Sequence, residues 1–115
     1  MEIEARKLLE DVRQAATLIA RFVSARSFDD YTSDVLLRSG VERQFEIIGE
    51  ALVRLTRAAP SVADQLSNVP RAIAFRNALV HGYDAVNDRT VWDIIQTHLP
   101  PLQRDVEALL RSEDP

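Results

Sequence analysis

Apolar residues recur at intervals of three and four positions along most of this 115-residue chain, which strongly limits the folds open to it. Between residues 2 and 24 the repeating positions are Ala5, Leu8, Val12, Ala15, Ile19 and Phe22. This spacing matches one buried face of an α-helix. The chain also holds only 3 glycines and 5 prolines. Few turn formers favour helices over a β-sandwich.

A second long helix is predicted from about residue 33 to residue 59. Its apolar seam comprises Leu37, Val41, Phe45, Ile48, Leu52 and Leu55. Thr32 or Ser33 is expected to cap its first turn. Gly40 and Gly49 lie inside the helix, where each costs about 1 kcal/mol relative to alanine. We therefore expect each glycine to mark close packing or a kink.

A connector over residues 60–69, with a possible short helical turn, leads to a third main helix. Pro70 suits the first turn of that helix, and Gly82 is expected to end it. Asn87 or Asp88 is expected to cap a fourth helical segment.

Pro100 and Pro101 are expected to interrupt the fourth segment, whose apolar pattern resumes at Leu102. Short connections place sequential helices antiparallel. The prediction is therefore a single domain over residues 1–115 with an all-α fold. Its architecture would be an up-and-down bundle of four to five helices.

Composition narrows the classes of function. The net charge of −4 matches nucleic acid poorly, so any RNA contact would need a local patch. The absence of cysteine excludes disulfides, thiolate zinc sites and a catalytic cysteine. The charged start of the chain shows no signal peptide, and no apolar stretch has membrane-spanning length. A cytoplasmic protein without membrane contact is expected.

Four hydrogen-bonding side chains cluster near the end of the third helix: Arg76, Asn77, His81 and Tyr83. Asn77 and His81 are four positions apart and share one helical face. Arg76 and His81 are five apart, which separates them by about 140° around an ideal helix. They converge only if Arg76 reaches round, if the helix unwinds near Gly82, or if a second chain completes the site.

These residue types suit phosphoryl transfer on RNA. Histidine moves protons near neutral pH, and arginine stabilises the charge that builds on a phosphate. RNA supplies its own nucleophile, the ribose 2′-hydroxyl, so no metal or cofactor is required. Since the cluster offers only one histidine, a symmetric dimer would bring two copies of His81 to one groove. The alternative is that His81 and Arg76 are only capping or packing residues.

The segment Arg76-Asn77-Ala78-Leu79-Val80-His81-Gly82-Tyr83 resembles the Arg-x4-His-x-Tyr motif of HepT-like toxins in the HEPN superfamily. The resemblance continues upstream through residues 42–52, which contain Ile48-Gly49-Glu50. Downstream it includes residues 90–95 and Leu99-Pro100. It covers most of the chain, from about Asp34 to Leu110.

The resemblance implies a HEPN helical bundle and a metal-independent endoribonuclease toxin of a toxin–antitoxin pair. Arg76 and His81 would be the catalytic pair in a homodimer groove. The partner would be a minimal nucleotidyltransferase antitoxin, which in this family can transfer AMP to the tyrosine that matches Tyr83. The added anionic group would block the groove and repel RNA.

Two other functions remain open at this point. The chain is alternatively a non-catalytic HEPN module that docks or positions a nucleotidyltransferase. It is otherwise a plain dimerisation domain, in which Arg76 and His81 are buried in bonds within one chain.

Three carboxylates, Glu42, Glu46 and Glu50, share one face of the second long helix. A row of salt bridges is the favoured interpretation. The alternative is that Glu46 or, better, Glu50 faces the cleft and supports Arg76 or His81. A di-iron site is excluded because no Glu-x-x-His pair is present.

Two further residues, His98 and Trp92, are of types that often occur in active sites or RNA-binding sites. His98 is interpreted as a packing or capping residue. Trp92 is interpreted as a core or interface residue rather than a platform for an RNA base.

Overall fold

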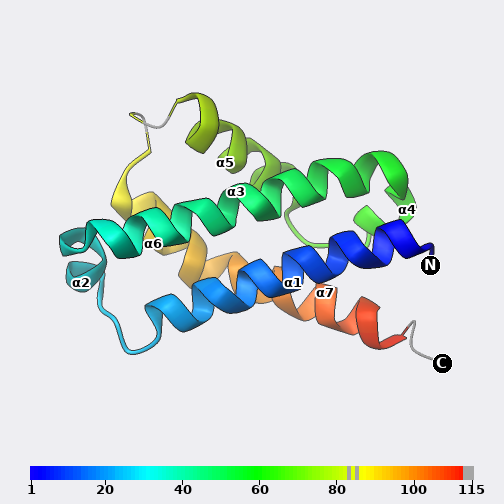
Figure 1. Cartoon of the computed structure of the whole chain (residues 1–115), viewed down its shortest axis with the longest axis horizontal. Coiled ribbons are helices and arrows are strands. Elements are labelled where there is room, and N and C mark those ends of the chain that lie inside the picture. Colours follow the sequence, from blue (N-terminus) through cyan, green and yellow to red (C-terminus); the bar gives the residue numbers. More distant parts are fainter. Residues whose placement is uncertain (83, 85, 113–115) are drawn as a thin grey trace.

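The computed structural model describes residues 1–82, 84 and 86–112, and these contain helices and no strand (Figure 1). The helices are α1 (Ile3–Val23), α2 (Phe28–Ser33), α3 (Val35–Ala58), α4 (Pro60–Ala63), α5 (Val69–His81), α6 (Asp88–Thr97) and α7 (Leu99–Ser112). The all-α prediction is confirmed. Five of these helices are long, and α2 and α4 are short turns within the connections.

Helices α1 and α3 run side by side and contribute more than half of the buried core residues (Figure 1). Helix α7 packs on α1 and on α6, whereas α5 packs chiefly on α3. The predicted seams are buried, and Val12, Val41 and Leu52 have no exposed surface. Phe22 is the exception at 36% exposed. It lies near the end of α1, where a methyl group on Gly40 would come within 3.4 Å of its ring.

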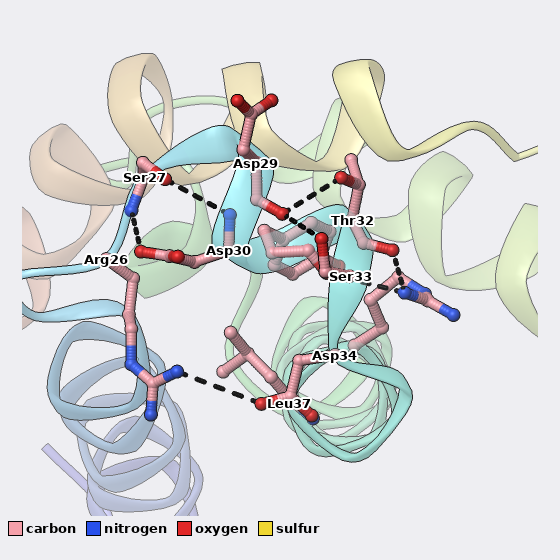
Figure 2. Close-up of polar contacts among 10 residues, drawn as sticks. Arg26, Ser27, Asp29, Asp30, Thr32, Ser33, Asp34 and Leu37 are labelled. Carbon is pink, nitrogen blue, oxygen red and sulfur yellow. Dashed lines mark hydrogen bonds and ion pairs between the residues drawn. The ribbon is translucent and has the colours of Figure 1, made fainter.

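The cap of α3 differs from the prediction. Asp34, rather than Thr32 or Ser33, accepts a hydrogen bond from the Leu37 N–H at 3.0 Å. The hydroxyls of Thr32 and Ser33 instead donate to the Asp29 carbonyl, at 3.0 and 2.6 Å (Figure 2). These two residues end the short helix before α3, so their hydroxyls are already used.

Helix α2 forms because Ser27 and Asp30 cap it reciprocally (Figure 2). The Ser27 side chain accepts from the Asp30 N–H at 3.1 Å, and the Asp30 carboxylate accepts from the Ser27 N–H at 2.9 Å. These bonds lower the pKa of Asp30. The cap fixes α2 over one end of the core, where it buries Tyr31 completely.

The hydroxyl of Tyr31 is buried without a hydrogen-bond partner among the described residues. Burial also raises the pKa of this phenol, and Glu42 and Asp88 add to the rise. An unpaired buried polar group costs about 1–3 kcal/mol. Tyr31→Phe is therefore expected to leave the free energy of unfolding unchanged or to raise it by about 1 kcal/mol, as measured by urea denaturation. A loss of more than about 1 kcal/mol would contradict the absence of a partner.

Pro100 and Pro101 begin a helix instead of interrupting one. They occupy the first turn of α7, where a missing backbone N–H costs no intrahelical bond. Helix α6 ends just before, and His98 is its C-cap residue. Its start is as predicted, because Asn87 accepts from the Thr90 N–H at 2.8 Å. None of the described helices is both long and apolar enough to cross a membrane.

Candidate active site

Helix α5 carries three of the four residues in the polar cluster. It stays helical through His81, and the Gly82 N–H still donates to the Ala78 carbonyl at 2.8 Å. The unwinding considered before Gly82 is therefore not present. Arg76 and His81 remain on different sides of α5, and no hydrogen bond joins them. The exposed His81 side chain bonds to no residue that the structure describes.

Arg76 is held at two points. Its Nη2 donates to Glu50 Oε2 at 3.0 Å, and its Nη1 donates to Asn77 Oδ1 at 2.9 Å. The Arg76 side chain retains 25% exposure. The bond to Asn77 turns the guanidinium toward the helical face that also bears His81. Arg76 thus reaches part of the way round its own helix.

Gly49 explains how Arg76 fits between the helices. A Cβ atom at Gly49 would lie 2.1 Å from the Cβ and 2.5 Å from the Cγ of Arg76. The stem of Arg76 therefore occupies the space that any other residue at position 49 would fill. The close packing expected at this glycine is confirmed, and the next residue along α3 is the carboxylate that binds the guanidinium.

A cleft of about 320 Å³ lies beside this contact, between α1, α3 and α5. Its charged lining residues are Asp11, Arg43, Glu46, Glu50, Arg54 and Arg76. Arg54 Nε donates to Glu50 Oε1 at 3.1 Å, so Glu50 pairs with two arginines. Arg43 pairs with Glu46 at 3.7 Å. The pair of Glu50 and Arg54 agrees with the interpretation of the glutamates as part of a row of salt bridges, whereas no role was predicted for Arg43.

The three glutamates of α3 have separate environments. Glu50 contacts Arg76, and Glu46 lines the same cleft. Burial raises the pKa of Glu42, and the Asp88 carboxylate raises it further while Arg38 lowers it. Glu42 therefore belongs to the corner where α2, α3 and α6 meet. Within the described ranges, no three histidine or acidic side chains gather as a metal site requires.

Trp92 is part of the packing between α2 and α6, in agreement with the sequence analysis. Its ring centroid lies 5.6 Å from that of Tyr31 and 6.2 Å from that of Phe28. His98 approaches Arg71, with 3.4 Å between Nε2 and Nη1. Tyr83 lies outside the described residues, so its expected role is not tested by this geometry.

The chain matches the model of the family described as "Ribonuclease HepT-like" over residues 12–109. It belongs to this family. A protein named "Putative RNase" from Caldanaerobacter subterraneus subsp. tengcongensis is 34% identical over 94% of this chain and 96% of its own length. A "Probable ribonuclease HepT" from Thermococcus cleftensis is 33% identical over 88% of this chain and 91% of its own. No solved structure matches the chain.

Family membership confirms the resemblance inferred from the motif and from the Ile48-Gly49-Glu50 segment. It also confirms the expectation that this protein is an enzyme of the endoribonuclease class. The match includes α3 and α5, so Glu50 and Asn77, which hold Arg76, lie within the matched part of the chain.

Proposed function

We propose that this HepT-like protein is a metal-independent endoribonuclease toxin that cuts RNA with Arg76 and His81. One observation carries the proposal. Glu50 and Asn77 fix the guanidinium of Arg76 at the cleft, and the exposed His81 lies about one and a half turns further along the same helix. Transesterification of RNA requires a positioned cation and a histidine in one groove, and a second chain would bring these two groups together.

In the proposed reaction, the ribose 2′-oxygen attacks the adjacent phosphorus and the bond from phosphorus to the 5′-oxygen breaks. The 2′-oxygen loses its proton, and the leaving 5′-oxygen gains one. His81 carries out proton transfer, and Arg76 stabilises the charge on the phosphoryl oxygens. Glu50 and Asn77 would act as positioning residues, because each accepts a hydrogen bond from the guanidinium of Arg76.

A homodimer would complete the groove. Helix α5 packs chiefly on α3, which leaves Val80 41% exposed on the helix that bears Asn77 and His81. A second copy of α5 against this side would cover apolar surface. Two-fold symmetry would bring both His81 side chains to one groove, which supplies an acid as well as a base.

The proposed regulator is a nucleotidyltransferase antitoxin that transfers AMP to Tyr83, with both proteins in the cytoplasm. This part rests on the family's motif, since Tyr83 follows His81 by two positions. A bulky phosphodiester there would add negative charge beside the histidine. It would repel RNA phosphates and block the approach to Arg76.

The test is incubation of the purified protein with RNA in excess EDTA. We expect cleavage at the same rate as in Mg²⁺, and loss of cleavage after treatment with the antitoxin and ATP. Cleavage that disappears in EDTA would overturn the metal-independent mechanism. A stable complex with the antitoxin, with no RNA cleavage by the freed protein, would instead support the non-catalytic docking module.

A further inference from the structure

A second cavity, of about 310 Å³, lies on the opposite flank of α5 from the Arg76 cleft. It shares no lining residue with that cleft. Its apolar walls are Phe45 and Ile48 of α3, Phe75 of α5, Ile94 of α6, and Leu99 and Leu102 of α7. It arises because α5 packs chiefly on α3 and only weakly on α6 and α7. The cavity is at the small end of the range for ligand pockets.

Three polar side chains line this apolar cavity: Asn68, Arg71 and His98. Arg71 Nη1 lies 3.4 Å from His98 Nε2. A guanidinium only donates hydrogen bonds, so in this pair Nε2 is the acceptor. Arg71 forms no ion pair with any described residue, in contrast to Arg54 and Arg76. Its charge is therefore available to an anion.

Asn68 also has unused hydrogen-bonding capacity. It is the N-cap residue of α5, yet its side chain makes no capping bond, and its backbone has the left-handed φ of 64°. The amide is therefore not committed to the helix end, and it lines the cavity as a donor and an acceptor. The aromatic wall beside it is formed by Phe45 and Phe75, which pack edge to face with 5.2 Å between their ring centroids.

We propose that this cavity binds one nucleoside phosphate, with the base between the apolar walls and the phosphate on Arg71 and His98. A flat aromatic group matches walls of phenylalanine and aliphatic side chains. An unpaired guanidinium beside an imidazole matches a phosphate. The Asn68 amide can bond to a base edge or to ribose.

The nucleoside phosphate can be a free nucleotide or one residue of an RNA strand. The second possibility, in which the ligand is part of an RNA strand, rests on the proposed ribonuclease function. Arg71 and Arg76 are five residues apart, about 7.5 Å along the axis of α5. Because the two arginines face opposite flanks of α5, an RNA strand would have to pass around α5 to place one phosphate at Arg76 and another at Arg71.

The experiment is an NMR titration of the labelled full chain with AMP, with adenosine and with inorganic phosphate. AMP is expected to shift the His98 and Phe75 signals and to bind more tightly than either fragment. Arg71→Ala should weaken AMP binding by about tenfold, the usual effect of losing one charged hydrogen bond. Arg104→Ala, an exposed arginine of α7 outside the cavity, is the control and should change nothing.

A second variant tests the cavity itself. Ala74 is exposed and lines the cavity, so Ala74→Leu should narrow it without changing charge or core. It should weaken AMP binding and leave phosphate binding unchanged. The proposal would be overturned if neither Arg71→Ala nor Ala74→Leu changed the affinity for AMP. It would also be overturned if AMP left the His98 and Phe75 signals unshifted.

Cleavage kinetics separate the two sources of the ligand. If the cavity takes a residue of the RNA, Arg71→Ala should raise KM for RNA and leave kcat unchanged. An unchanged KM, with AMP binding weakened, would assign the site to a free nucleotide. RNA cleavage without AMP binding would overturn the cavity proposal alone, whereas AMP binding without RNA cleavage would overturn the proposed function alone.

Discussion

His81→Ala is expected to lower the rate of RNA cleavage by about 10²–10⁴-fold, the usual contribution of a general acid or base. The free energy of unfolding should stay within about 0.5 kcal/mol of wild type, because His81 is exposed and bonds to no described residue. Single-turnover cleavage and urea denaturation of the same preparation measure the two quantities. This separation of activity from stability distinguishes a catalytic histidine from a packing one.

The matched control for this variant is Arg57→Ala. Arg57 is exposed near the end of α3, outside the described cavities, and forms no ion pair with a described residue. It should cleave RNA like wild type. A His81→Ala protein that cuts normally, or an Arg57→Ala protein that loses as much activity, would contradict the assignment of His81.

Gly49→Ala is expected to disturb both the site and the fold. The new methyl group would lie 2.1 Å from the Cβ of Arg76, so α5 would have to move away from α3. Overpacking of this kind costs about 1–3 kcal/mol. A shift of about 1 Å in a catalytic group can cost about 10²-fold in rate. We therefore expect a loss of cleavage of tenfold or more, together with a lower midpoint of urea unfolding.

Gly40→Ala is the control on the same helix. Its methyl group would meet only the Phe22 ring, at an ordinary contact distance of 3.4 Å. Replacing a glycine inside a helix by alanine stabilises it by up to about 1 kcal/mol. This variant should be as stable as wild type or more so, with unchanged cleavage. A Gly49→Ala protein that matched it in both measurements would contradict the role given to Gly49.

The helices of this protein follow from local patterns that the sequence displays. Spacing of apolar residues predicted the buried faces of α1 and α3, and Asn87, one of the two caps expected for α6, is the residue that caps it. The sequence did not decide which of several adjacent residues caps a helix. Asp34 caps α3 in place of Thr32 or Ser33, because those two hydroxyls bond back to α2. Such competition depends on where the preceding helix ends.

The candidate site was predictable only in part. Helical geometry separates Arg76 from His81 by about 140°, and the unbroken α5 keeps them apart. The contact between Glu50 and Arg76 was one of two alternatives in the sequence. Its physical reason, the crossing of α5 over Gly49, required the fold. Arg71 carried no signal of its own, since its partner His98 is 27 positions away.

The most direct test of the central claim is the chemistry of the RNA ends produced in EDTA by wild type beside His81→Ala. Wild type is expected to produce 2′,3′-cyclic phosphate and 5′-hydroxyl ends, and the variant is expected to produce almost no product. Ends that carry a 5′-phosphate, or undiminished cutting by His81→Ala, would contradict the central claim.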